Sequence, residues 1–88
     1  MDDEAIQAKI AEHAREVFQD PGLVYAGDRL FRDILGFDSV RAVQLILAVE
    51  EALGVTLHED EVDRMHTMGD MLAILRSKTS SSMTAQTD

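Results

Sequence analysis

Apolar residues recur at helical spacing through most of this chain. In the first segment, from about Asp3 to Phe18, the recurring apolar positions are Ile6, Ile10, Ala14 and Val17. Acidic side chains cluster in its first turn, and Asp20-Pro21-Gly22 interrupts the pattern. This combination predicts an amphipathic helix that ends before the Pro-Gly pair.

A long connection follows the first predicted helix, from Asp20 to about Phe37. Within it, apolar residues again fall at helical spacing: Leu30, Phe31, Ile34 and Leu35. Connections of this length in small domains are usually functional or well packed. The apolar residues favour packing, so we predict a short helical turn that lies against the core.

The strongest helical pattern runs from Ser39 to Leu53, and Gly54 is well placed to end it. The predicted inward face consists of Ala42, Val43, Leu45, Ile46, Val49 and Leu53. The predicted water-facing stripe consists of Arg41, Gln44, Ala48 and Glu51. A wide apolar face opposite a polar stripe is the pattern of an amphipathic helix that packs on the core.

Two further helical segments are expected after a short extended stretch over Val55-Thr56-Leu57. Residues 58–64 predict one or two helical turns that begin with acidic residues. Thr67 with Asp70 resembles a capping box and opens a last helix to about Leu75. Its predicted inward residues are Met68, Met71, Leu72 and Leu75. Residues from Ser77 onward are polar and lack periodicity, so we predict a domain over 1–77 and a disordered polar tail over 78–88.

The predicted elements define an all-α fold. Three longer helices and one short helix, with a long first loop, form a small four-helix bundle. No segment predicts a strand, and there are no internal repeats. The 88 residues allow one small domain.

Composition and charge exclude several functions. The chain has no cysteine, which excludes disulfides, zinc thiolate sites and thiol catalysis by its own residues. Its net charge of -9 argues against binding to nucleic acid or to an anionic membrane surface. The acidity favours partners with basic docking surfaces, although it could also serve solubility alone. The acidic N-terminus does not resemble a signal peptide and no apolar run is long enough to span a bilayer, so we expect a cytoplasmic protein.

Leu35-Gly36-Phe37-Asp38-Ser39-Val40 places one serine where a loop turns into a long apolar helix. A hydroxyl at that point is exposed at the positive end of the helix dipole, which suits a phosphate diester. Asp38 and Ser39 are also strong N-cap residues, so the pair could simply cap the helix. No base is evident beside Ser39 and no Gly-x-Ser-x-Gly turn surrounds it, which argues against a hydrolase. His13, His58 and His66 lack metal-ligand spacing, so we expect no metal site.

These residues and the helix after them resemble the prosthetic-group site of acyl and peptidyl carrier proteins. In that family the serine of a Gly-x-Asp-Ser-(Leu/Val/Ile) motif bears 4'-phosphopantetheine, and the resemblance extends from about Leu30 to Leu75. It implies a non-catalytic carrier modified on Ser39 by a separate phosphopantetheinyl transferase that uses coenzyme A. The thiol of the arm would hold an acyl, aminoacyl or polyketide group as a thioester.

The resemblance also implies partners. They are the transferase, a loading ligase or synthetase, and downstream enzymes that transfer acyl or aminoacyl groups, with a monomer expected for a protein that visits several enzymes. The residues alone leave open an alternative, an acidic helical interaction module that carries no prosthetic group.

Several positions acquire expected roles from the resemblance. Asp38 would assist transferase recognition, and Val40 and Leu47 would contact partner enzymes, although both could instead be packing residues. Carriers of bacterial fatty-acid synthesis usually have acids where this chain has Arg41 and Gln44. We therefore expect a specialised carrier rather than a housekeeping fatty-acid carrier, unless Arg41 merely pairs with an acid such as Asp38.

By family position, a cleft for the load would be lined by Phe31, Ile46, Val49, Leu57, Val62, Met65 and Met71. Ordinary core packing explains the same residues. Arg32 occupies a position that is often apolar in fatty-acid carriers. A charge at the mouth of the cleft favours shorter loads over a long buried chain.

Overall fold

The structure is a computed structural model that describes the backbone of residues 2–87 and the side chains of residues 2–79. Its elements are α1 (Asp3–Val17), a 3₁₀ turn η1 (Phe31–Asp33), α2 (Ser39–Leu53), α3 (Glu59–Asp63) and α4 (Met68–Thr87). The described residues form no strand beyond one isolated antiparallel bridge between Leu30 and Thr67. The predicted all-α bundle of three longer helices and one short helix is therefore confirmed.

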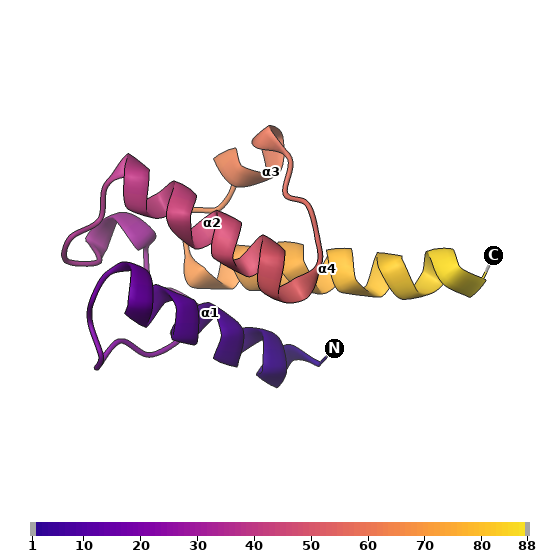
Figure 1. The fold of residues 1–88 in the computed structure, drawn as a ribbon, viewed down its shortest axis with the longest axis horizontal. Helices are drawn as coiled ribbons and strands as arrows, with labels where there is room; N and C mark the ends of the chain where they lie inside the picture. Colours follow the sequence, from indigo (N-terminus) through magenta and orange to yellow (C-terminus); the bar gives the residue numbers. More distant parts are fainter. Residues whose placement is uncertain (1, 88) are drawn as a thin grey trace.

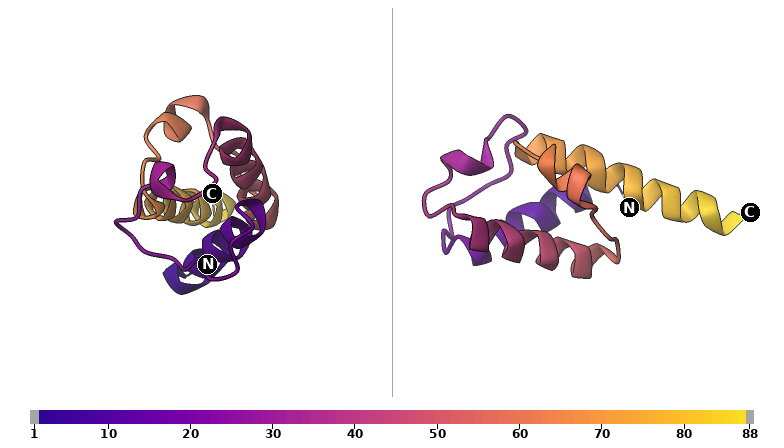
Figure 2. Two further views of the ribbon diagram at one scale, coloured as in Figure 1. Left: turned by 90° about the vertical axis from the view of Figure 1, so that its left-hand side faces the viewer. Right: turned by 90° about the horizontal axis from the view of Figure 1, so that it is seen from above.

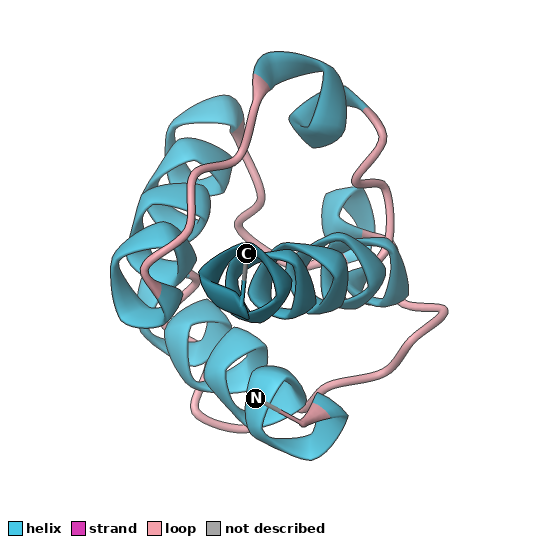
Figure 3. Cartoon of the chain, turned by 90° about the vertical axis from the view of Figure 1, so that its right-hand side faces the viewer, coloured by secondary structure: helices cyan, strands magenta, loops and turns pink. Residues whose placement is uncertain are grey.

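The three long helices lie along one another, as Figure 1 shows. α1 contacts both α2 and α4. α2 and α4 run in one direction and α1 runs in the opposite direction. The short α3 lies on the side of α2 and α4 that is opposite α1, which is clear in the end-on view of Figure 3. α4 extends past the ends of the other helices (Figure 2).

The core is built from the apolar faces that the sequence predicts for α1 and α4. Ile6, Ile10 and Ala14 of α1 are fully buried. The predicted inward residues of α4 are also buried, namely Met68, Met71, Leu72 and Leu75. Leu45 and Val49 complete this core from α2. The 3.6-residue periodicity therefore identified the correct inward faces of α1 and α4.

The long connection between α1 and α2 is fixed to the start of α4 by backbone hydrogen bonds. The Phe31 N–H donates to the His66 carbonyl at 2.9 Å, and the Met68 N–H donates to the Arg29 carbonyl at 3.0 Å. The Gly69 N–H donates to the Gly27 carbonyl at 2.9 Å. The last two bonds satisfy donors in the first turn of α4, Met68 and Gly69, that have no partner within the helix. The connection is thus packed, as predicted.

One residue of this connection was assigned wrongly. Leu35 was predicted to pack on the core, but its side chain is 90% exposed. The helical spacing that predicted its burial does not continue, because η1 ends at Asp33 and Ile34 is already extended. Ile34 is buried as expected.

The inward face of α2 is rotated relative to the prediction. Val43 was expected inside, but it is 54% exposed. Arg41 and Ala48 were expected to face water, but both are only partly exposed. The physical reason is the position of α1, which packs along α2 and covers that side of the helix. The small Ala48 side chain and the long Arg41 stem border this contact with α1. The pattern of apolar residues in α2 alone does not predict where α1 packs.

The end of α4 also differs from the prediction. The helix was expected to end near Leu75, but its backbone stays helical to Thr87. Residues 76–87 contain no Gly or Pro, which would stop a helix. Lys78, predicted to lie in the polar tail, forms an ion pair with Glu61. The division into a domain over 1–77 and a disordered tail over 78–88 stays a prediction, since the side chains of residues 80–88 lie outside the described part.

Candidate functional site

Ser39 is the first residue of α2, and its side chain is exposed. Asp38, in an extended conformation, is the N-cap, and its Oδ1 accepts the Arg41 N–H at 2.8 Å. Gly36 has a φ of +87°, in the left-handed region that glycine adopts without strain, and it turns the chain into the helix. The loop thus presents Ser39 to solvent while Asp38 makes the cap, so the hydroxyl is not needed for the helix start.

The electrostatic surroundings of Ser39 suit an anion. The first N–H groups of a helix have no partner within it, and they carry the positive end of the dipole. Here Asp38 satisfies the Arg41 N–H through its side chain and the Ala42 N–H through its carbonyl, at 3.0 Å. Apart from this N-cap carboxylate, the first turn of α2 holds no acidic residue. The residues present therefore fit a phosphodiester attached at the Ser39 hydroxyl.

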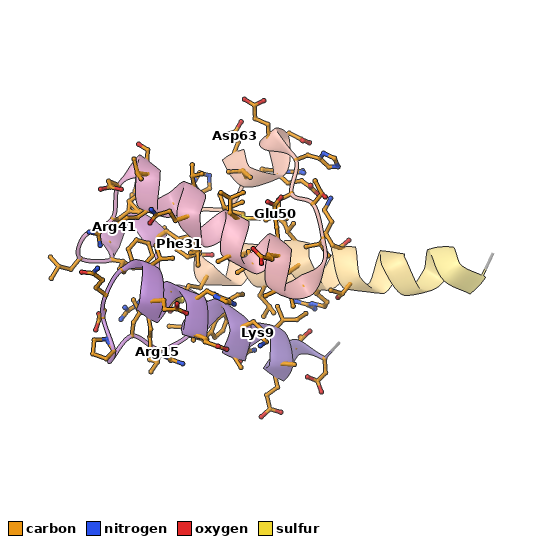
Figure 4. The ribbon with its side chains drawn as sticks, viewed as in Figure 1. Lys9, Arg15, Phe31, Arg41, Glu50 and Asp63 are labelled. Carbon is orange, nitrogen blue, oxygen red and sulfur yellow. The ribbon has the colours of Figure 1, made fainter. Side chains whose placement is uncertain are left out.

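Arg41 connects this site to α1. Its Nη1 donates to the Val17 carbonyl at 3.4 Å, at the C-terminal end of α1, where a cation is favoured by the helix dipole. Figure 4 shows Arg41 at the end of the bundle where α2 begins. Among the described residues Arg41 forms no ion pair, which argues against the alternative that it merely pairs with an acid such as Asp38.

The outward face of α2 is apolar. Val40 is 67% exposed and Leu47 is 57% exposed, which favours contact with partners over the alternative that they are partly buried packing residues. Val43 lies on the same exposed side, and Leu35 adds a further exposed apolar side chain just before Ser39. A contiguous exposed apolar surface on a small domain is the kind of surface that binds a partner.

The acids of α2 contribute little to the outward face near Ser39. Glu50 is partly buried, and its Oε2 accepts the Leu57 N–H at 2.7 Å (Figure 4 labels Glu50). Glu51 is exposed, but it lies at the far end of the helix from Ser39. Apart from the N-cap Asp38, which is exposed, further exposed acids are on α3, where Asp63 points away from the bundle in Figure 4.

An apolar cavity of about 210 Å³ lies between the helices and is partly open to the surface. It is lined by Phe18, Phe31, Phe37, Ala42, Leu45, Ile46, Val62, Met65 and Met71. Five of the seven predicted lining residues are among them, whereas Val49 and Leu57 are buried outside the lining. Arg32 is exposed and is not a lining residue, so the predicted charge at the mouth is not found.

The sequence interpretation included Phe31 but missed the two other aromatic residues that line the cavity, Phe18 and Phe37. The rings of Phe18 and Phe37 are tilted against each other with centroids 6.3 Å apart. Phe37 lies two residues before Ser39, so the cavity lining begins beside the candidate site. Its position as the apolar residue of the Gly-Phe-Asp-Ser loop was the sequence signal that could have identified Phe37 as a lining residue.

Neither a metal site nor a membrane span is found in the described part of the chain. No group of three or more His, Cys, Asp or Glu residues there could hold a metal ion. None of the described helices is long and apolar enough to cross a membrane.

Comparison with known proteins identifies this helical chain as a carrier of a phosphopantetheine group. Residues 8–75 match the family model described as a phosphopantetheine attachment site. The chain is 33% identical over 76 residues to an acyl carrier protein of Acidothermus cellulolyticus. The aligned region covers 86% of this chain and 90% of the relative. It is also 25% identical over 75 residues to an acyl carrier protein of Exiguobacterium sibiricum, and this aligned region covers 85% of each chain.

The chain therefore belongs to the acyl carrier, or phosphopantetheine-binding, protein family. It is a non-catalytic carrier domain, and its prosthetic group is 4'-phosphopantetheine. Its partners include a phosphopantetheinyl transferase and acyl-handling enzymes.

Proposed function

We propose that Ser39 is the attachment point of 4'-phosphopantetheine. The observation that carries this proposal is the exposed Ser39 side chain at the start of α2, where Asp38 already makes the cap. When bound, the group supplies a thiol that holds an acyl, aminoacyl or polyketide intermediate as a thioester for delivery to partner enzymes. The chain itself supplies no catalytic residue for this step.

The residues around Ser39 have distinct tasks in this proposal. Free N–H groups of the first turn of α2 stabilise the negative phosphate. Asp38 keeps that turn in place through the Arg41 N–H, and the Arg41 side chain ties the turn to the end of α1. Ser39 is thus held on a rigid helix end, while its hydroxyl stays accessible to a transferase.

The partner surface has two parts of different chemistry. The outward face of α2 offers Val40, Val43 and Leu47, which fit an apolar surface. The acids of α3 fit basic residues, and Glu59, Asp60 and Asp63 are all exposed. Between the N-cap Asp38 and Glu51, α2 offers no exposed acid to a partner that presents only basic groups. This difference supports a specialised carrier with dedicated enzymes, rather than a housekeeping fatty-acid carrier. A cytoplasmic monomer is part of the same proposal.

The exposed apolar face also favours a second candidate function. An acidic helical interaction module without a prosthetic group would use the same face of α2. The two functions differ at Ser39. Only the carrier requires its hydroxyl.

The test is the intact mass of the protein after incubation with coenzyme A and a broad-specificity phosphopantetheinyl transferase. The variants are Ser39→Ala and, as a matched control, Ser77→Ala, which removes another exposed serine hydroxyl. We expect one phosphopantetheine on the wild type and on Ser77→Ala, and none on Ser39→Ala. Absence of any gain in the wild type, with the transferase active on another carrier, would favour the unmodified module.

A further inference from the structure

α3 forms one wall of the apolar cavity without a core of its own. None of its residues is buried. Val62, in α3, and Met65, just after it, are the residues of this segment that line the cavity. Figures 1 and 3 show α3 on the side of α2 and α4 that is opposite α1. This short helix therefore covers the cavity from that side.

The segment that contains α3 is anchored at both ends. Before it, the Leu57 N–H donates to Glu50 Oε2 at 2.7 Å. After it, the His66 carbonyl accepts the Phe31 N–H at 2.9 Å, and the His66 N–H donates to Asp70 Oδ2 at 3.0 Å. Between these anchors the segment can move away from the cavity only if its contacts in the middle are broken.

One ion pair fixes the middle of this segment. Glu61 Oε1 lies 2.7 Å from Lys78 Nζ of α4, and the two side chains are 19% and 21% exposed. The hydrogen bond from Lys78 holds the pKa of Glu61 below its usual value, so the carboxylate is charged at neutral pH. The other ion pair of this segment, Arg64–Asp60, lies within it and is exposed. In the described part of the chain, Glu61–Lys78 is thus the ion pair that joins α3 to another helix.

Lys78 lies outside the part of the chain that matches the family model, residues 8–75. The pair is therefore not accounted for by that match. It uses the continuation of α4 beyond Leu75, which the polar composition of residues 77–88 did not predict.

We propose that Lys78 is a positioning residue that latches α3 over the apolar cavity and limits how often the cavity admits an apolar ligand. The cavity, of about 210 Å³, takes a ligand of the size of a short acyl chain or a single ring. If Ser39 carries the load, as proposed above, that ligand is the apolar part of the load. The latch itself does not depend on Ser39, and it is testable in the unmodified protein.

The first test is amide hydrogen exchange of the unmodified protein, read by NMR at Val62 and Met65. Both amides donate within the segment, to the His58 and Val62 carbonyls at 3.0 Å. The variants are Lys78→Met, which keeps most of the apolar stem, and Glu61→Gln, which keeps an acceptor for the His58 N–H. The matched control is Lys9→Met, which breaks the exposed Lys9–Glu12 pair within α1.

We expect Lys78→Met and Glu61→Gln to speed exchange at both amides about fivefold, with Ile10 and Leu75 unchanged. Lys78→Arg should restore the slow rate, and Lys9→Met should leave it unchanged. Unchanged exchange at Val62 and Met65 in Lys78→Met would overturn the latch. An equal increase at Ile10 would overturn it too, because it would show general destabilisation instead of local opening.

The second test measures access to the cavity with benzene as the probe. Benzene is titrated into the wild type and Lys78→Met, and its exchange is read from the methyl signals of Met65 and Met71. We expect benzene to enter Lys78→Met faster than it enters the wild type, and to shift the same methyl signals in both proteins. Equal entry rates would overturn the proposed latch. They would not affect the proposal for Ser39, because the mass measurement tests that proposal separately.

Discussion

Asp38 Oδ1 accepts the Arg41 N–H at 2.8 Å across Ser39, so the start of α2 is capped by the residue before the serine. This relationship separates two roles that the sequence left combined in the Asp-Ser pair. Asp38 stabilises the helix, and the Ser39 hydroxyl is left for chemistry.

The first prediction compares these two neighbours. Asp38→Ala removes the cap and should lower the free energy of unfolding by about 1 kcal/mol. Ser39→Ala should change it by less than about 0.5 kcal/mol, because an exposed side chain outside the cap contributes little. Urea denaturation followed by circular dichroism measures both. Equal losses in the two variants would contradict the assignment of Asp38 as the cap.

The second prediction concerns the close approach of two backbones. A Cβ on Gly69 would lie 2.6 Å from the Gly27 carbonyl oxygen, which is a backbone atom and cannot easily move aside. Gly69→Ala should therefore destabilise the protein by about 2 kcal/mol, although alanine normally favours a helix over glycine.

The matched control is Gly27→Ala, whose Cβ would meet Tyr25 Oη at an ordinary 3.6 Å. Its thermal midpoint should stay close to that of the wild type, whereas that of Gly69→Ala should fall clearly. A stabilised Gly69→Ala would show that the connection is not packed tightly against α4.

The third prediction is a pH dependence that originates at the start of α4. The hydrogen bond from the Thr67 N–H, at 3.0 Å, is the main cause that holds the pKa of Asp70 below its ordinary 3.8. A carboxyl whose pKa is lowered by folding stabilises the fold above its unfolded-state pKa. That contribution is lost as the pH falls through the folded-state pKa.

Asp70→Asn should therefore be less stable than the wild type at pH 7, and the difference should shrink as the pH falls below about 3.8. Thermal unfolding of both proteins between pH 7 and pH 2.5 measures it. The comparison between the two proteins cancels the general effect of neutralising the other acids. A stability difference that stays constant over this range would contradict the role of Asp70.

The fourth prediction concerns the apolar face of α2. Leu47→Ser removes an exposed apolar side chain, so the free energy of unfolding should change by less than about 0.5 kcal/mol. If partners dock here, kcat/KM of a phosphopantetheinyl transferase for the variant should fall about tenfold. The matched control is Val24→Ser, since Val24 is 59% exposed but lies in the α1–α2 connection. Equal rates for Leu47→Ser and the wild type would exclude Leu47 as a contact of that transferase.

Local signals in the sequence predicted much of the fold. α2 begins at Ser39 and ends before Gly54, whose φ is +67°. The Asp70 N–H donates to Thr67 Oγ1 at 3.0 Å and the Thr67 N–H donates to Asp70 Oδ2 at 3.0 Å, which confirms the predicted capping box. These features depend on residues a few positions apart, so the sequence contains them directly.

The parts that could not be predicted depend on contacts between distant residues. Arg41 faces α1 because its side chain reaches the Val17 carbonyl, 24 residues earlier. Val43 is exposed because α1 packs on a different side of α2. Likewise, α4 continues to Thr87, and Lys78 pairs with Glu61 from a segment whose composition indicated a polar tail.

The central claim is that the prosthetic group is attached at Ser39. Its most direct test is fragmentation mass spectrometry of the peptide that contains residues 33–41, after modification of the full chain by a transferase and coenzyme A. This peptide contains no hydroxyl-bearing residue other than Ser39. Phosphopantetheine on that peptide, located at Ser39, is the result we predict. Modification found on any other peptide, with Ser39 unmodified, would contradict the account.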